Sequence, residues 1–308
     1  MELSVIIVNW NTKELLSRCL SLVYDTVTNL ECEVFVVDNA SQDGSAAMVR
    51  RFFPQTRLLE NEENVGFARA NNQAIKESRG RYILLLNSDT FVMEGTIERM
   101  VAFMDAHPEA GVAGCRLYYP NGKLQLSCTS FPTLATEFYL LTSLDRLFPR
   151  NPVLGRYWMT YWDFSSVREV DVVLGAFIIV RSQAMEEVGL LDESFFMYSE
   201  ELDWCYRFKE KGWKIYYMPY AEAIHIGGAS TEKVKAEMIL ELYRSRVAFF
   251  RKHYGLPNAL LLKIMLAAAS IPRLFLFSTR YILKDEAGEN ARQKWFGYWK
   301  LLKALPSL

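Results

Sequence analysis

Three small polar residues, Asn87-Ser88-Asp89, follow the apolar run Tyr82–Leu86, which is typical of a buried strand. A carboxylate at the carboxyl end of such a strand can hold a hard cation, because these ions prefer oxygen ligands. A cation held there would also neutralise the charge of a bound diphosphate. Asn, Ser and Asp are equally common in turns, so the segment read by itself also fits a simple turn.

A second carboxylate, Asp38, ends the apolar run Glu33–Val37. It could accept hydrogen bonds from a ribose or from a base N–H, and the alternative is an Asx turn or a helix cap made by Asp38 or Ser41. The first apolar run, Leu3–Val8, leads into Asn9-Trp10-Asn11 and not into the G-x-G-x-x-G turn of dinucleotide-binding proteins. A nucleotide-binding oxidoreductase is therefore disfavoured.

Three acidic residues, Glu200, Glu201 and Asp203, begin a segment with helical spacing, Glu200–Lys211. A favourable interaction with the helix dipole would explain them. The aromatic and apolar residues directly before them, Phe195–Tyr198, favour instead a partly buried carboxylate with a raised pKa. Such a group can act as a general base.

His225 and the polar loop Asn64–Phe67 are further candidates. His225 precedes Gly227-Gly228 and is one of three histidines, which makes it a candidate phosphate or metal contact, although a lone histidine is more often structural. The loop leads into a helical segment that contains Asn71-Asn72. The start of that helix could support an anionic ligand or could simply be capped.

Alternating strands and helices must position these residues. The segments with helical spacing between the apolar runs are Lys13–Tyr24, the stretch from Ser41 to Arg51, and Phe67–Ser78, and a further short strand is expected at Arg57–Glu60. Strands separated by helices of this length imply parallel pairing through right-handed crossovers. Ligands of such α/β folds bind at the carboxyl ends of the strands.

The 308 residues allow one large domain or two modest ones. The net charge of -1 hides an asymmetry, because residues 256–308 hold eight Lys/Arg and three Asp/Glu, whereas residues 1–255 hold 27 and 33. The five cysteines are odd in number and lack C-x-x-C spacing, which disfavours a disulfide framework or a zinc site. The sequence predicts no signal peptide, and no charge-free window of ~20 apolar residues suggests a membrane span.

The basic tail contains two candidate amphipathic helices. The first, Leu256–Lys284, is rich in Leu, Ile, Met and Phe, with basic residues near one face, and Pro272 is expected to kink or split it. In the second, Trp295, Trp299 and Leu302 share a stripe. Apolar faces edged by Lys, Arg and Trp suit a helix that lies in a membrane interface. The alternative is packing on the body of the protein or on a second subunit.

Taken in order, these segments resemble family 2 glycosyltransferases with the GT-A fold, and within that family the bacterial rhamnosyltransferase-like branch. The resemblance covers about residues 3–250. It rests on the following runs: Ser4–Asn11, Val36–Ser41, Asn64–Ala68, Leu85–Asp89, Gly175-Ala176, Gly189–Glu193 continuing through Arg207, and His225.

The resemblance implies a fold and a division of the chain. The fold would be α/β of the GT-A type, with a Rossmann-like, mostly parallel central sheet flanked by helices and a C-terminal amphipathic helical extension. Residues 1–115 would form the nucleotide-sugar-binding half of one domain, and residues 116–255 its acceptor-binding and catalytic half. Residues 256–308 would form the amphipathic helices.

The resemblance also implies a role for each motif residue. Asp89 would bind Mg²⁺ or Mn²⁺ with His225, and Glu201 would be the catalytic base. Two departures affect these roles: Asn87 replaces the first Asp of a D-x-D motif, and Glu201 stands where Asp is commoner, so Glu200 could exchange roles with it. The donor-binding set is Asn9, Asn11, Asp38, Asn64, Gly66, Asn71, Asn87, Ser88 and Asp89. The acceptor and sugar pocket would contain Gly175, Ala176, Glu200, Asp203 and Trp204.

The expected function is an inverting glycosyltransferase of cell-envelope polysaccharide synthesis. The donor would be dTDP-L-rhamnose, with a UDP-sugar as the alternative, and the acceptor a polyprenyl-diphosphate-linked saccharide. A non-catalytic membrane-bound scaffold is the rival from another class. The C-terminal helices would hold the protein on the inner face of the cytoplasmic membrane. No nucleic-acid partner is expected, and a homo-oligomer stays open.

Overall fold

The computed structural model describes residues 1–27, 29–227, 235–281 and 286–308. Gly228, which follows His225 by three positions in the sequence, and Lys284, the last residue of the first predicted tail helix, lie outside them. The described chain forms two compact units. The sheet unit comprises Met1–Phe131, Trp162–Phe196 and the segment from Glu200 that includes the last strand. The helical unit comprises Pro132–Tyr161, Met197–Ser199 and the C-terminal helices.

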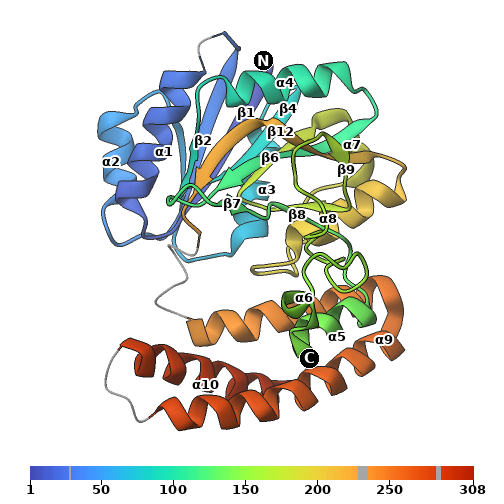
Figure 1. The fold of residues 1–308 in the computed structure, drawn as a ribbon. Coiled ribbons are helices and arrows are strands. Elements are labelled where there is room, and N and C mark those ends of the chain that lie inside the picture. The colour runs from blue at the N-terminus through green and yellow to red at the C-terminus, as the bar shows by residue number, and fades with distance from the viewer. Residues whose placement is uncertain (28, 228–234, 282–285) are drawn as a thin grey trace. The chain divides into compact units, whose positions relative to one another are not determined.

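The first part of the sheet unit alternates strands and helices as the sequence predicts (Figure 1). Strands β3-β2-β1-β4 are neighbours in that order, and all three pairings are parallel. Asn9 therefore pairs with Asp38, and Val8 with Asn87, at one edge of the sheet. The elements are β1 Leu3–Asn9, α1 Lys13–Thr26, β2 Cys32–Asn39, α2 Ser45–Phe52, β3 Arg57–Asn61, α3 Phe67–Glu77 and β4 Tyr82–Asn87.

The second part of the sheet unit adds antiparallel strands. The sheet continues β4-β11-β6-β12-β5, and β11 is antiparallel to both of its neighbours. Strand β12 pairs parallel with β6 and antiparallel with β5, which puts His225 opposite Thr90. The elements are β5 Thr90–Val92, α4 Thr96–Ala106, β6 Ala110–Tyr118, β7 Leu124–Gln125, β8 Cys128–Thr129, β9 Arg168–Glu169, β10 Val172–Val173, β11 Phe177–Arg181, α7 Ser182–Val188, α8 Glu200–Glu210 and β12 Lys214–His225.

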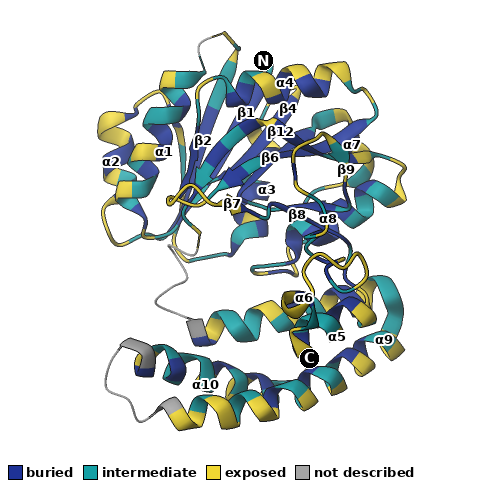
Figure 2. Cartoon of the chain, in the orientation of Figure 1, coloured by how far each residue is buried: buried dark blue, intermediate teal, exposed yellow. Residues whose placement is uncertain are grey.

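The core of this unit lies on both faces of the sheet, as the buried strands in Figure 2 show. Leu3, Val5 and Ile7 of β1 face a cluster that contains Leu16 and Leu20 of α1. Helix α3 contacts β1 and β2. Strands covered on both faces read as continuous apolar runs instead of alternating ones, which explains why the sequence showed them so clearly.

The helical unit contains α5 Leu134–Thr142, α6 Leu144–Leu147, α9 Lys235–Tyr281 and α10 Glu286–Ala304. Helices α9 and α10 pack along each other, and the rings of Phe277 and Tyr298 stack with centroids 6.1 Å apart. The break in α9 is at Gly255, whose φ of 82° is non-helical, and not at Pro272, which stays inside the helix. Pro272 therefore does not split the helix, and the break at Gly255 precedes the predicted start of the first tail helix at Leu256.

Helix α9 also bears on the expectation that no segment could span a membrane. Its stretch Ala236–Thr279 contains an 18-residue window with a mean hydropathy of 1.9, of which 17% is buried. By length and composition alone, this helix could cross a membrane. The expectation from the sequence required a window free of charge, whereas this criterion allows two charged residues in the window, so the absence of a membrane span stays a prediction.

Candidate functional site

The carboxyl ends of β1 and β2 carry a hydrogen-bonded group of side chains that we call the closed cluster: Asn9, Thr12, Asp38, Ser41 and Ser88. Asn9 Nδ2 donates to Asp38 Oδ1 at 2.9 Å and to Ser41 Oγ at 3.0 Å. Thr12 Oγ1 donates to Asn9 Oδ1 at 2.7 Å and lies 2.8 Å from Ser88 Oγ. Adjacent parallel strands thus bring three predicted donor-binding residues into one rigid group.

Asp38 also forms the Asx turn that was its alternative interpretation. Its Oδ2 accepts a hydrogen bond from the Ser41 backbone N–H at 2.9 Å. Asn11 closes the same turn from the other side, because its Oδ1 accepts from Gln42 N at 2.7 Å and its own N–H donates to Ser41 Oγ at 2.9 Å. Asn11 has a left-handed φ of 54°, a conformation that Asn tolerates well. The turn and a donor-binding role are compatible.

Amide side chains form a neighbouring group around Gly66. Asn39 Nδ2 lies 3.3 Å from both Asn64 Oδ1 and Gly66 O, and Asn64 Oδ1 accepts from Gly66 N at 3.0 Å. Gly66 has a φ of 84°, and a Cβ there would stand 2.5 Å from the Phe196 carbonyl oxygen. The chain therefore needs glycine at this position for its own packing. Asn71 Nδ2 donates to Phe67 O within α3 at 2.9 Å.

Asp89 and His225, which we call the facing pair, meet at the junction of β4, β5 and β12. Asp89 Oδ1 lies 3.3 Å from His225 Nε2, while Asp89 Oδ2 accepts from the Gly227 N–H at 3.1 Å. The Asp89 carbonyl accepts from Ile226 N at 3.1 Å, which ties the two strand ends together. Residues 136 positions apart in the sequence are thus brought together as the resemblance implied.

The facing pair fits a small divalent cation. A carboxylate oxygen and an imidazole nitrogen are both ligands that Mg²⁺ or Mn²⁺ accepts, and adjacent ligands of such an ion stand ~3 Å apart. The Nε2–Oδ1 separation of 3.3 Å matches that spacing. Among the described residues, no group of three or more His, Cys, Asp or Glu side chains is placed so that it could hold a metal ion by itself. Further ligands would have to come from a bound diphosphate or from water.

The rest of the predicted donor-binding motif is held by the backbone. Asn87 N donates to Ala176 O at 3.1 Å, which links the end of β4 to the segment before β11. Ala176 is buried, whereas a Cβ added to Gly175 would meet only Phe67 Cε1, at 4.0 Å. There is space beside Gly175, as the predicted close approach of a sugar requires.

Glu200 and Glu201, the acid pair, begin α8. Burial, followed by the charge of Glu201, raises the pKa of Glu200 well above its ordinary value. Glu200 Oε2 is buried without a hydrogen-bond partner among the described residues. The two preceding residues, Tyr198 and Ser199, have left-handed φ values of 66° and 63°. Such backbone conformations are unfavourable for side-chain-bearing residues and are commonest at functional sites.

Asp203 and Trp204 lie on the same helix but hold a structural turn. Asp203 Oδ2 accepts from Arg207 Nε at 2.8 Å, and Arg207 also donates to the carbonyls of Val188 and Leu190. Trp204 Nε1 donates to Gly189 O at 2.8 Å. Their predicted place in the acceptor pocket stays a prediction.

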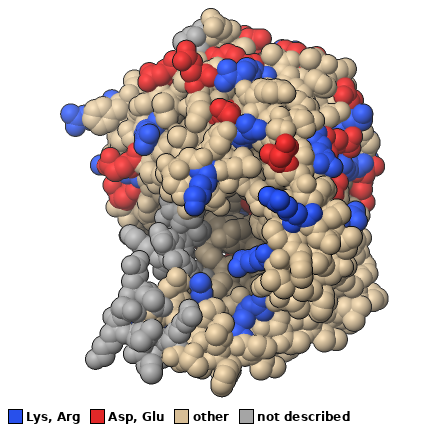
Figure 3. Space-filling model, in the orientation of Figure 1, with Lys and Arg blue, Asp and Glu red and all other residues tan. Residues whose placement is uncertain are grey.

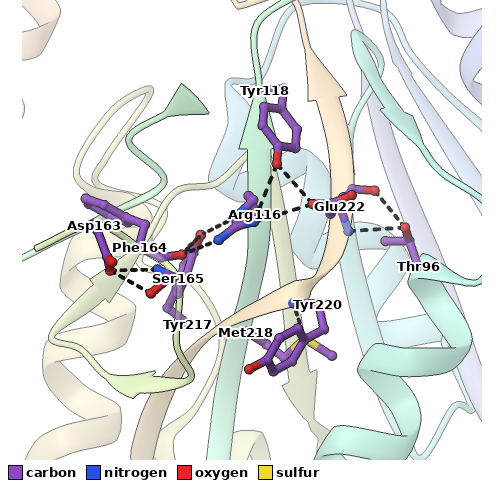
Figure 4. A network of polar contacts seen from close by, with 10 residues as sticks. All are labelled: Thr96, Arg116, Tyr118, Asp163, Phe164, Ser165, Tyr217, Met218, Tyr220 and Glu222. Atoms are coloured by element: carbon purple, nitrogen blue, oxygen red, sulfur yellow. Dashed lines mark hydrogen bonds and ion pairs between the residues drawn. The ribbon is translucent and has the colours of Figure 1, made fainter. Parts of the chain in front are cut away.

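A polar network that the sequence did not suggest joins strands β6 and β12 of the sheet (Figure 4). Arg116 on β6 donates to Phe164 O at 2.5 Å and lies 3.6 Å from Glu222 on β12. Tyr118 Oη donates to Glu222 Oε1 at 3.0 Å, and Tyr217 Oη donates to Phe164 O at 3.2 Å. The network fixes the aromatic segment around Phe164 against β6 and β12, at the irregular stretch of β12 between Met218 and Glu222.

Comparison with known proteins identifies the family. The sequence model of Glycosyl transferase family 2 matches residues 4–160, about half of the chain. The chain belongs to glycosyltransferase family 2. It is 28% identical over 265 residues to the N-acetylglucosaminyl-diphospho-decaprenol L-rhamnosyltransferase of Mycobacterium tuberculosis, covering 82% of this chain and 85% of that protein.

Solved structures with the GT-A fold confirm the predicted architecture of this family 2 glycosyltransferase. GalNAc-T7 with UDP, GalNAc and Mn²⁺ gives a TM-score of 0.62 at 13% identity, covering 100% of this chain and 56% of that one. The mannosyltransferase PcManGT from Pyrobaculum calidifontis, with GDP-Man and Mn²⁺, gives 0.57 at 17%, covering 99% and 86%. Both neighbours contain a divalent cation, and at these identities the likeness establishes the fold alone.

Two residues that contact predicted site residues of this glycosyltransferase were missed in the sequence. Thr12 joins the closed cluster, and Gln125 Oε1 lies 3.0 Å from His225 Nδ1. Thr12 follows the first strand directly and could have been included with Asn9 and Asn11. Gln125 lies on a two-residue strand in an irregular stretch, and such short strands leave no periodicity to detect.

Proposed function

We propose that this protein transfers a sugar from a nucleoside-diphosphate donor to an acceptor hydroxyl, with inversion at the anomeric carbon. The observation that carries the proposal is the facing pair, where Asp89 Oδ1 and His225 Nε2 stand 3.3 Å apart beside the closed cluster. Ser88 links the two groups, because its Oγ lies 2.8 Å from Thr12 Oγ1 and its backbone continues into Asp89. A nucleotide held at one group would reach the other with its diphosphate.

The closed cluster is the proposed site for the nucleoside. Asp38 is 3% exposed and already accepts two hydrogen bonds within the protein, which hold its carboxylate in one orientation. Its remaining lone pairs can accept from a ribose hydroxyl or a base N–H. A divalent cation held by Asp89 and His225 would offset the negative charge that develops on the departing diphosphate.

Glu201 is the proposed base. The acceptor hydroxyl needs a proton acceptor as its oxygen bonds to the anomeric carbon and the bond to the diphosphate oxygen breaks on the opposite face. Glu200 holds its proton to a higher pH than an ordinary glutamate, because it is buried beside a second acid. A neutral Glu200 leaves Glu201 as the carboxylate of the pair that can take the proton.

The similarity to the mycobacterial enzyme supports a proposal for the two reactants. That protein is named for transfer of L-rhamnose to N-acetylglucosaminyl-diphospho-decaprenol. We propose dTDP-L-rhamnose as donor and a polyprenyl-diphosphate-linked saccharide as acceptor for this chain. A UDP-sugar is the second candidate donor. The test is incubation with each donor, Mn²⁺ or Mg²⁺, and an N-acetylglucosaminyl-diphospho-lipid, with the product analysed by mass spectrometry and NMR.

We expect a product one deoxyhexose heavier than the acceptor, with the anomeric configuration opposite to that of the donor. Retained configuration would contradict the single displacement, and transfer only from UDP-sugars would replace the donor. No transfer and no donor hydrolysis with any nucleotide sugar would favour the scaffold alternative.

The exposed face of α9 supports attachment to an anionic membrane surface, in keeping with a lipid-linked acceptor. Residues 242–284 hold eight Lys/Arg and no Asp/Glu. Figure 3 shows mainly uncharged side chains, with a few basic ones, over α9 and α10. One face of α9, at spacings of four and seven residues, carries exposed apolar side chains, while Ala259, Leu262, Leu266 and Ser270 on another face are buried. The exposed side chains are Leu256, Leu260, Ile264, Ile271 and Phe275.

Such a face suits insertion at the level of the lipid headgroups, with the basic residues attracted by anionic lipids. We propose that it holds the protein on the inner face of the cytoplasmic membrane. The double substitution Ile264→Ser with Phe275→Ser should lower binding to phosphatidylglycerol vesicles by tenfold or more. Burying each of the two apolar side chains in the membrane contributes about 1.5–3 kcal/mol of binding free energy. Phe52→Ser, which changes another exposed phenylalanine, in the sheet unit, is the control.

Unchanged vesicle binding in the double variant would remove the membrane role of this face. If the same substitutions instead convert a dimer to a monomer in light-scattering measurements without lipid, the face is a subunit interface.

A further inference from the structure

Gln125 is a buried polar residue for which neither the sequence motifs nor the transfer mechanism provides a role. It lies on β7, which pairs with β6 through Leu117 opposite Gln125. Its side chain is directed to His225: Gln125 Oε1 lies 3.0 Å from His225 Nδ1, and the two residues are only 8% and 9% exposed. The ring nitrogen on the other side, Nε2, is the one that faces Asp89.

The chemistry of imidazole links these two contacts. A carbonyl oxygen only accepts, so Nδ1 must carry the proton when it contacts Gln125 Oε1. In the neutral ring, Nε2 then has a free lone pair that points to Asp89 Oδ1 at 3.3 Å. A lone pair and a carboxylate oxygen do not attract each other, but both attract a cation. The opposite tautomer would put an N–H between Nε2 and Asp89 and would close the pair with an internal hydrogen bond.

The backbone that carries Gln125 is held in place by hydrogen bonds on both sides of this residue. The β6–β7 hairpin is closed by hydrogen bonds from Tyr119 N to Lys123 O at 2.8 Å and from Gly122 N to Tyr119 O at 2.9 Å. Two residues beyond Gln125, Ser127 Oγ donates to Cys115 O on β6 at 3.0 Å. A partner fixed in this way can impose both the tautomer and the ring orientation on a metal-binding histidine.

We propose that Gln125 is a positioning residue that keeps His225 in the Nδ1–H tautomer, so that Nε2 and Asp89 together present a cation site. The proposal rests on the metal dependence of the proposed function. It adds the residue that leaves His225 Nε2 able to bind a cation together with Asp89. Groups that accept the second ring N–H of a metal-binding histidine typically change metal affinity about 10–100-fold when they are removed.

The direct test is the tautomer of His225 in the metal-free full-length protein. Long-range ¹H–¹⁵N spectra of ¹⁵N-histidine-labelled protein, recorded at alkaline pH where imidazole is neutral, distinguish a protonated from a bare ring nitrogen. The chain has three histidines, so the signal that disappears in His225→Gln is assigned directly. We expect a protonated Nδ1 and a bare Nε2 in the wild type. Gln125→Leu should shift the population towards Nε2–H, and Gln125→Glu should restore Nδ1–H.

Manganese affinity provides the second readout, measured from the free-ion EPR signal in a titration of the protein with MnCl₂ in the presence of dTDP. We expect Gln125→Leu to weaken Mn²⁺ binding about 10–100-fold and Gln125→Glu to retain it. Leu124→Gln, on the exposed face of the same short strand, is the control for disturbance of β7 and should leave both readouts unchanged.

A protonated Nε2 in the wild type, or a tautomer that does not change in Gln125→Leu, would overturn the proposal. The tautomer is read without metal, donor or turnover, so this outcome is separate from a failure of the proposed function. That failure would appear as a wild type with the expected tautomer that neither binds nor turns over a nucleotide sugar.

Discussion

The closed cluster and the facing pair are joined by the peptide bond between Ser88 and Asp89, yet their side chains interact in opposite ways. In the closed cluster, Asn9, Thr12 and Asp38 exchange hydrogen bonds of 2.7–2.9 Å and hold one another in place. In the facing pair, Asp89 and His225 approach to 3.3 Å with groups that share an affinity for a cation. The acid pair resembles the facing pair in this respect, since Glu200 Oε2 is buried with no hydrogen-bond partner among the described residues.

This difference distinguishes residues that shape a binding surface from residues that are proposed to take part in the reaction. A fully bonded cluster is rigid and can be a preformed surface for a nucleoside, at little further cost in ordering. Two carboxylates, or a carboxylate and an imidazole lone pair, repel each other when they are buried together. The binding of a ligand, a proton or a cation removes that repulsion. Changes in the closed cluster should therefore alter binding and stability, whereas changes in the facing pair and the acid pair should alter turnover and pH dependence.

The largest effect should come from Glu201→Gln. The variant lacks the proposed base for the acceptor hydroxyl, so kcat should fall about 10²–10⁴-fold while donor KM changes little. The measurement is steady-state release of nucleoside diphosphate, with circular dichroism to confirm the fold. Glu210→Gln, at the exposed end of the same helix, is the control. Near-wild-type kcat would move the base role to Glu200 or elsewhere.

Asp38→Ala should act on binding instead. It removes the proposed donor contact and leaves the Asn9 amide without its 2.9 Å partner. We therefore expect donor KM to rise about 10–100-fold and the free energy of unfolding to drop by about 1–3 kcal/mol. Asp25→Ala, at an exposed position of α1, should change neither. An effect confined to kcat would contradict the assignment of this cluster to the nucleoside.

Gly66→Ala should destabilise the fold next to the closed cluster. Gly66 and Gly44 have nearly the same φ, 84° and 83°, but only at Gly66 would a Cβ meet backbone, the Phe196 oxygen at 2.5 Å. We expect Gly44→Ala, with a ψ of 18° in the left-handed region, to cost about 1–2 kcal/mol. Gly66 has a ψ of 172°, a conformation open essentially to glycine, so Gly66→Ala should cost about 2–4 kcal/mol with the clash added. Denaturant unfolding measures both. Equal costs would show that neither the ψ of Gly66 nor the Phe196 contact adds strain to the alanine variant.

The smallest effect concerns the pH dependence of stability. The pKa of Glu200 is raised in the folded protein by burial, so the folded state binds this proton more tightly than the unfolded chain. Stability from this group is therefore complete below the ordinary glutamate pKa and is lost as the pH rises towards the raised value. Relative to wild type, Glu200→Gln should gain about 2–4 °C in Tm between acidic and neutral pH. A pH-independent difference would show that Glu200 ionises normally.

The sequence predicted the fold more completely than the site. The buried strands β1, β2 and β4 read as apolar runs and their parallel order followed from the intervening helices, so the placement of Asp38 and Asn87 was predictable. Strand β11 enters the sheet antiparallel to β4 after a long irregular stretch, and nothing local specifies that order. The same holds for Gln125 and Arg116, whose partners are 100 and 106 positions away.

Individual roles also depended on contacts that spacing does not reveal. Gly66 was assigned to the donor pocket, but the Phe196 carbonyl already requires glycine there. Trp204 was placed in an acceptor pocket, and its indole is bonded to Gly189. A motif names the residue types, whereas the direction of each side chain is set by packing from distant parts of the chain.

The central claim is that Asp89 and His225 hold a divalent cation on the diphosphate of a nucleotide-sugar donor. Its most direct test is the release of dTDP or UDP by wild type and Asp89→Ala, after EDTA treatment and with added Mn²⁺ or Mg²⁺. We predict that wild-type release stops with EDTA and returns with metal, and that Asp89→Ala stays at least about 10²-fold slower at any metal concentration. Release by wild type that is unchanged by EDTA, or near-wild-type release by Asp89→Ala, would contradict the account.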